Sequence, residues 1–133
     1  MPQPMTIGAL AKAAGVNVET VRYYQRRGLI ATPPKALGGQ RRYAETVLRQ
    51  ITFIRRGQAL GFTLDEITGL LKIADGRDCE AGRGYAQSKL DELKSRLVEL
   101  NRIVKQLKIL VDECDGNRRK ADCPVIRHLR GEA

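Results

Sequence analysis

Apolar residues between positions 85 and 111 recur at alternating steps of three and four, after a first step of four. This is the spacing of a heptad repeat, in which two of every seven positions face a partner helix. Because the positions between them carry mostly charged or amide side chains, the apolar stripe is too narrow for a globular core. The stripe consists of Ala86, Leu90, Leu93, Leu97, Leu100, Val104, Leu107 and Val111. It predicts a long coiled-coil dimerisation helix.

A cysteine lies near each end of this predicted helix. Cys79 precedes the helix, Cys114 follows it, and Cys123 lies nine residues beyond Cys114. The residues from 85 to 111 span roughly 40 Å at about 1.5 Å per residue, so one chain cannot join Cys79 to Cys114 without breaking the helix. In an antiparallel pair of chains, Cys79 of one copy instead lies beside Cys114 and Cys123 of the other. We therefore expect an antiparallel homodimer.

Residues 6–30 carry the signals of two short helices joined by a tight turn. Thr6 and Asn17 are N-cap residues, and Gly15 turns the chain between the helices. This predicts a helix-turn-helix whose second helix directs polar side chains toward the major groove of DNA. Plain helical packing with the same geometry is the alternative. The outward-facing residues are Glu19, Thr20, Arg22 and Tyr23.

The next segment, ATPPKALGGQRRY at residues 31–43, predicts a wing. Two prolines end the preceding helix, and Gly38-Gly39 is a hairpin turn signal before a return strand over residues 40–43. At the base of the wing, side chains that can meet phosphates or the minor groove are Arg41, Arg42 and Tyr43. A solvated basic loop is the alternative.

Two amphipathic helices follow, over about residues 44–60 and 63–73, and a capping box of Thr63 and Glu66 opens the second. In the tail, the apolar residues Val125, Ile126 and Leu129 predict a short packed helix.

The expected fold is mainly α and has three regions. These are a winged helix-turn-helix DNA-binding region at 1–43, linking helices at 44–75, and metal-binding loops with the dimerisation helix and tail at 76–133.

The charge of the chain is concentrated in its first half. Lysine and arginine number 24 against 15 acidic residues, a net charge of +9. Residues 12–56 alone contain ten basic and two acidic side chains, a net of +8. A polyanion partner would therefore bind this half.

Composition also narrows the class of protein. No apolar run approaches the ~18 residues of a membrane span and the N-terminus lacks a signal-peptide core, so we expect a cytoplasmic protein with no membrane partner. Three cysteines are too few for a disulfide scaffold, and a reducing compartment favours free thiols or metal ligands. A cysteine nucleophile needs an activating base. The single histidine, His128, lies in the tail, so we do not expect an enzyme.

Four motifs together resemble the MerR family of transcription regulators, and its mercury-responsive members most closely. They are IGALAKAAGVNVETVRYYQRRGLI, GGQRRY, RRGQALGFTLDEI, and the set Cys79, Cys114 and Cys123 followed by proline. The resemblance implies a homodimer on operator DNA between two promoter elements. Metal converts such a dimer from repressor to activator by distorting the DNA, so that RNA polymerase engages both elements. It also implies DNA contacts by Arg22, Tyr23, Arg41 and Tyr43, to which position and charge add Thr20 and Arg42.

The cysteines indicate what kind of metal the chain senses. Three thiolates without histidine or carboxylate favour a soft ion, and the resemblance implies Hg(II) held by Cys79 of one subunit and Cys114 and Cys123 of the other. Sensors of Pb(II) and Cd(II) share this pattern and stay open, while Zn(II) usually takes four ligands. Further alternatives are His128 as a fourth ligand, a Cys114–Cys123 disulfide switch, and a metal-sequestering protein that does not bind DNA.

Overall fold

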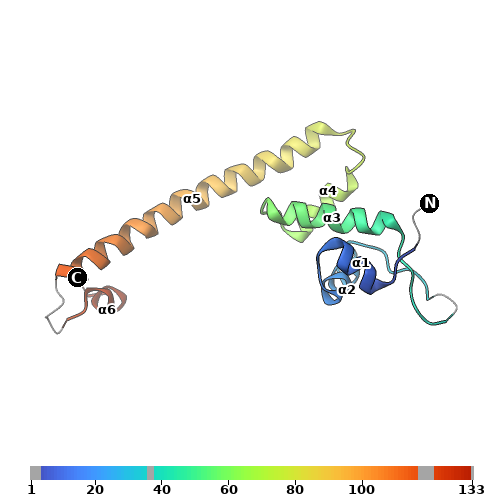
Figure 1. Cartoon of the computed structure of the whole chain (residues 1–133). Helices are drawn as coiled ribbons and strands as arrows, with labels where there is room; N and C mark the ends of the chain where they lie inside the picture. The colour runs from blue at the N-terminus through green and yellow to red at the C-terminus, as the bar shows by residue number, and fades with distance from the viewer. Residues whose placement is uncertain (1–3, 36–37, 117–121, 133) are drawn as a thin grey trace. The chain divides into compact units, whose positions relative to one another are not determined.

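In a computed structural model the chain is mainly α, as predicted, and the structure describes residues 4–35, 38–116 and 122–132 (Figure 1). Its helices are α1 (Ile7–Ala14), α2 (Val18–Arg26), α3 (Glu45–Ala59), α4 (Leu64–Lys72), α5 (Cys79–Gly116) and α6 (Pro124–Leu129). The chain divides into two compact units, residues 1–85 and 86–133. Helix α5 begins in the first unit and continues into the second.

The helix-turn-helix forms where its capping residues predict it. Thr6 Oγ1 accepts a hydrogen bond from the Ala9 N–H at 3.2 Å, and Asn17 Oδ1 accepts one from the Thr20 N–H at 2.8 Å. Between α1 and α2, Gly15 has a φ of 70°, in the left-handed region that glycine adopts without steric cost. The predicted cap, turn and cap are therefore confirmed.

The wing contains less strand than predicted. In place of a return strand there are two isolated antiparallel bridges, Lys35 with Arg41 and Met5 with Tyr43. Met5 and Tyr43 exchange both backbone hydrogen bonds, at 2.8 and 2.7 Å. Because the segment changes its pairing partner within three residues, it cannot extend one ladder. Both glycines of the predicted turn have positive φ, 102° and 90°, and the two residues before them lie outside the described residues.

One hydrophobic core joins the helix-turn-helix to the linking helices. Helix α1 packs against α2 and α3, and α3 packs against α4. The buried members of the core are Leu10, Ala11, Val21, Tyr24, Leu29, Ile30, Tyr43, Ile51, Ile54 and Ile67. The regions predicted at 1–43 and 44–75 therefore share a core within the first unit.

The two buried tyrosines of this core keep their hydroxyls hydrogen-bonded. Tyr24 Oη donates to Gln58 Oε1 at 2.9 Å, and Gln25 Nε2 donates to Tyr43 Oη. Within the described part of the chain, no buried side-chain nitrogen or oxygen is left without a partner. The core thus accommodates tyrosine without the cost of an unpaired polar group.

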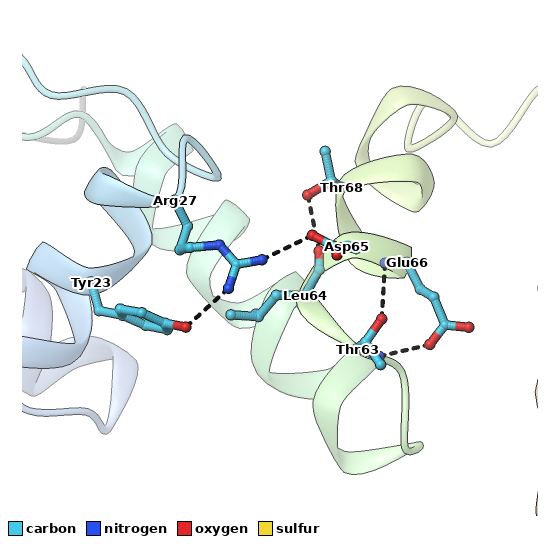
Figure 2. A network of polar contacts seen from close by, with 7 residues as sticks. All are labelled: Tyr23, Arg27, Thr63, Leu64, Asp65, Glu66 and Thr68. Atoms are coloured by element: carbon cyan, nitrogen blue, oxygen red, sulfur yellow. Dashed lines mark hydrogen bonds and ion pairs between the residues drawn. The ribbon is translucent and has the colours of Figure 1, made fainter.

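Helix α4 begins with a capping box and packs against the start of α5. Thr63 Oγ1 accepts from the Glu66 N–H at 3.2 Å and Glu66 Oε1 accepts from the Thr63 N–H at 2.8 Å, so the predicted capping box is confirmed (Figure 2). Further along α4, Gly69 lies against Tyr85 of α5. A Cβ atom at Gly69 would lie 1.9 Å from Tyr85 Oη, so the close approach of the ring requires glycine.

The long helix extends beyond the predicted residues 85–111, since α5 runs from Cys79 to Gly116. Asp78 opens it, with Oδ1 accepting from the Ala81 N–H at 3.0 Å. The prediction that Cys79 and Cys114 lie outside the helix was therefore wrong, because they occupy its first residue and its last turn. In the added turns, apolar residues do not recur at steps of three and four, so the sequence pattern did not predict that these turns are helical.

The heptad stripe of α5 is exposed in the single chain. The exposed fraction is 39% at Leu93 and 59% at Leu97, in the middle of the stripe. A stripe of this kind normally faces another helix, so the surface is available to a partner.

Although α5 is long, neither it nor any other helix in the described ranges has an apolar stretch that could cross a membrane.

The short C-terminal helix α6 is present as predicted, but it is not packed as expected. None of its residues is buried. Leu129, which should have faced a core, is 74% exposed. The apolar side of α6 is therefore a surface of the single chain.

The packing of Tyr85 on Gly69 predicts a stability difference between two helical glycines. Gly84→Ala should stabilise the protein by up to about 1 kcal/mol, since alanine favours helix and nothing lies near its added Cβ. We expect Gly69→Ala to be roughly 1–2 kcal/mol less stable than Gly84→Ala, because its Cβ overlaps the Tyr85 ring. Urea denaturation at matched protein concentration measures both. Gly69→Ala with Tyr85→Ala should lose the penalty, and equal stabilisation by the two single variants would contradict the packing.

Candidate DNA interface and metal centre

Helix α2 presents its predicted recognition residues to different degrees. The Arg22 side chain is 54% exposed, and its Nη1 lies 3.1 Å from Glu19 Oε1. An exposed ion pair contributes at most about 1 kcal/mol, so Arg22 can exchange Glu19 for a phosphate. Tyr23 is 39% exposed. Thr20 is half-buried and its hydroxyl donates to Asn17 Oδ1 at 2.9 Å, which fixes it at the start of the helix.

Two hollows lie between α2 and the wing. The larger has a volume of about 410 Å³ and the smaller about 300 Å³. Arg22, Gln25 and Arg41 line both, so α2 and the wing form one concave basic surface. Arg26 lines the smaller hollow, although the sequence analysis did not select it. The feature of the sequence that could have indicated Arg26 is the cluster of basic residues at the end of α2.

The three predicted wing residues differ in exposure. Arg41 and Arg42 are exposed, and Arg41 Nε donates to the Pro33 carbonyl oxygen at 3.0 Å. That bond orients the guanidinium while leaving its other N–H groups for a phosphate. Tyr43 is only 1% exposed. Its ring belongs to the core, and a direct side-chain contact to DNA stays a prediction that this burial argues against.

A polar network joins α2 to α4 in the same unit (Figure 2). Arg27 Nη1 donates to Tyr23 Oη at 3.0 Å, and Arg27 Nη2 donates to Asp65 Oδ1 at 2.8 Å. The Tyr23 hydroxyl, followed by Asp65, raises the pKa of Arg27. The guanidinium carbons of Arg26 and Arg27 lie 5.8 and 5.9 Å from the Tyr23 ring centroid, within the range of cation–π attraction. The sequence analysis missed this network.

Two of the three cysteines meet at the start of α6. All three are free thiols. The N–H groups of Ile126 and Val125 lower the pKa of the Cys123 thiol, and a hydrogen bond from Cys114 adds to this effect. Partial desolvation raises the pKa of Cys114, and its hydrogen bond to Cys123 acts in the same direction. The pair therefore favours a thiolate at Cys123 and a thiol at Cys114.

The third cysteine lies at the opposite end of α5 from Cys114. Cys79 is exposed at the first residue of α5. In the described part of the single chain, no group of three side chains from cysteine, histidine and the acidic residues is placed to hold a metal ion. His128, the possible fourth ligand, is exposed in the last turn of α6.

The opposite pKa shifts predict an order of alkylation. As pH rises, iodoacetamide should modify Cys123 before Cys114, because the thiolate is the nucleophile and Cys123 forms it at lower pH. Mass spectrometry after trypsin digestion separates the two sites, since basic residues lie between them. Cys114→Ser should reduce but not abolish the reactivity of Cys123, because the backbone N–H groups remain. Modification of Cys114 first would contradict the assignment.

The chain matches two family descriptions that together cover most of its length. Residues 5–73 match the MerR HTH family regulatory protein, and residues 48–110 match the description "MerR, DNA binding". The first match covers α1 to α4, and the second runs from α3 into α5.

Individual relatives agree with these matches. A mercuric resistance operon regulatory protein from Shigella flexneri is 44% identical over 97% of this chain and 90% of its own length. One from Bacillus cereus is 38% identical over 92% of this chain and 95% of its own. The lead(II)-bound transcription regulator PbrR691 from Ralstonia metallidurans CH34 is 33% identical, with a TM-score of 0.80 over 94% of this chain and 98% of its own. The chain belongs to the MerR family of DNA-binding transcription regulators.

Proposed function

We propose that this regulator is a homodimer that senses Hg(II) and controls a mercury-resistance operon. Cys79 of one subunit and Cys114 and Cys123 of the other would bind the ion through their sulfurs. The observation that carries the proposal is the placement of the cysteines, two of them together near the end of α5 and the third at its first residue.

The length of α5 supports a site shared between subunits. Helix α5 is continuous over 38 residues. The stretch from Cys79 to Cys114 corresponds to about 50 Å of helix at about 1.5 Å per residue. An antiparallel partner would bring the opposite ends of two such helices together, so each Cys79 would meet a partner's Cys114 and Cys123.

The exposed stripe of α5 supports the same dimer. Leu90, Leu97 and Val104 are each between 45% and 59% exposed. Burying such residues against a second helix is favourable by about 25 cal/mol per Å² of apolar surface. The stripe therefore supplies the association energy, and the thiols at its two ends supply the ligands.

The choice of metal follows from ligand chemistry and from the relatives. Three sulfur ligands favour a soft ion, and the mercuric resistance regulators from Shigella flexneri and Bacillus cereus point to mercury. The lead(II) complex of PbrR691 keeps lead as the alternative. Cd(II) shares the same preference for sulfur, while Zn(II) would lack its usual fourth ligand.

The proposed output is a change in the shape of operator DNA. Arg22 and Arg41 would anchor each DNA-binding unit on phosphates, with Thr20, Tyr23 and Arg42 adding contacts. Fixing one α5 against the other would then bend or untwist the DNA between the two units, so that RNA polymerase engages both promoter elements. The basic concave surface and the family's DNA-binding function favour this over a metal-sequestering protein.

Competitive metal titration tests the proposal. The probe is a duplex selected by the protein from a random pool, with a fluorescent base analogue at its centre. We expect Hg(II) to distort this duplex at concentrations at least tenfold below those of Pb(II), Cd(II) or Zn(II). Earlier distortion by Pb(II) or Cd(II) would select the alternative sensor. Metal uptake without any change in the DNA would contradict a regulator of this kind.

A mixing experiment tests the shared site. Cys79→Ala, and the double variant Cys114→Ala with Cys123→Ala, should each bind the duplex normally but lose the Hg(II) response. Mixed dimers of the two should regain one complete site, about half of the wild-type Hg(II) capacity in that species. Because a site within one chain would be broken in both variants, mixed dimers without Hg(II) binding would refute the arrangement.

A further inference from the structure

Asp65 is an exposed carboxylate that reaches from α4 to the DNA-binding helix. Its side chain is 91% exposed, and that of its partner Arg27, the C-cap residue of α2, is 39% exposed. An ion pair this exposed contributes little to the free energy of folding. The pair matters less for stability than for where it holds the Arg27 guanidinium.

The start of α4 gives Asp65 a defined position. It lies in the first turn of α4, between the capping-box residues Thr63 and Glu66. The box pairs the backbone N–H groups of Thr63 and Glu66, as Figure 2 shows. A carboxylate in a first turn is also favoured by the helix dipole. The backbone at Asp65 is therefore fixed where its carboxylate meets Arg27.

Arg27 determines how the Tyr23 hydroxyl can bond. Its Nη1 donates to Tyr23 Oη at 3.0 Å, which occupies an acceptor site of the hydroxyl and leaves the proton free to donate. Phosphate oxygens and many base-edge atoms are acceptors, so they suit this orientation. Donation from a cation also polarises the hydroxyl and strengthens its own donation.

Asp65 also determines how Arg27 meets DNA. With one N–H group on Tyr23 and one on Asp65, the guanidinium is partly neutralised and held in place. If Asp65 were lost, an additional cation at the end of α2 could bind a phosphate of any DNA sequence. A phosphate contact of this kind raises affinity without specificity and makes binding more sensitive to salt.

We propose that Asp65 is a specificity-determining residue of the DNA interface. By holding Arg27 against Tyr23, it directs the Tyr23 hydroxyl to donate to operator DNA and withholds Arg27 from the phosphates of unrelated DNA. The inference rests on the proposed contact between Tyr23 and DNA.

The test compares Asp65→Ala with Glu45→Ala, which removes a carboxylate from the first turn of α3. Fluorescence anisotropy over a series of KCl concentrations measures binding to the selected duplex and to poly(dI-dC). We expect Asp65→Ala to reduce the ratio of specific to non-specific affinity about tenfold. Its slope of log K against log[KCl] on poly(dI-dC) should steepen by about 0.9, one added phosphate contact. An unchanged slope and ratio, or the same changes in Glu45→Ala, would overturn the proposal.

Two further backgrounds separate the roles of Arg27 and Tyr23. In Arg27→Gln, adding Asp65→Ala should no longer steepen the slope. In Tyr23→Phe, adding Asp65→Ala should lower the ratio of specific to non-specific affinity less than it does in the wild type. Additive effects in either background would show that Asp65 does not act through these residues. Thermal unfolding of each variant distinguishes these effects from loss of fold.

The same variants distinguish a failure of the role proposed for Asp65 from a failure of the proposed contact between Tyr23 and DNA. If Tyr23→Phe leaves binding to the selected duplex unchanged, the contact between Tyr23 and DNA is wrong and the inference fails with it. If Tyr23→Phe lowers the ratio of specific to non-specific affinity but Asp65→Ala does not, only the role of Asp65 is wrong. Neither result depends on metal.

Discussion

Helix α5 cannot bury its own apolar stripe, and the rest of the structure depends on this constraint. In the single chain the stripe stays exposed, from Leu90 at 45% to Val111 at 55%. The free energy of burial can be gained only from a second helix. In the proposed dimer, the association that covers the stripe also brings the cysteines together. Dimerisation is then a condition of metal binding rather than a separate property.

The elements that carry the residues proposed to contact DNA are held by one core. Tyr24 of α2 and Tyr43 of the wing are both buried with Ile54 of α3 and Ile67 of α4. Because protein interiors are close-packed, α2 and the wing cannot shift on α3 without opening cavities. The proposed change in DNA shape therefore calls for each unit to be displaced as a whole. Gly69 of α4 and Tyr85 of α5 are in contact where α5 begins, within this unit.

The two halves of the chain use charge in different ways. On the surface proposed to meet DNA, Arg22 and Arg27 are paired with Glu19 and Asp65, so the acidic residues would influence how these cations meet phosphate. At the other end of the chain, Cys123 is activated by backbone N–H groups and by its neighbour Cys114 rather than by a basic side chain. Two thiols thus lie together within one chain, and the proposed third comes from the partner.

The sequence alone determined the features that depend on neighbouring residues. The caps at Thr6, Asn17 and Thr63 act within one turn, and the stripe of α5 is periodic. Both features can therefore be predicted from the sequence. The ends of α5 were misjudged because its outer turns lack that periodicity. The family match agreed with the motifs read from the same residues.

Only the tertiary structure decided which side chains are buried and which distant ones meet. Tyr43 stands beside two arginines in the sequence but belongs to the core. Arg27 and Asp65 are 38 residues apart yet form an ion pair. Cys114 and Cys123 meet because α6 places its first N–H groups beside them. Burial and long-range pairing result from the packing of whole elements, and no local pattern of residues encodes them.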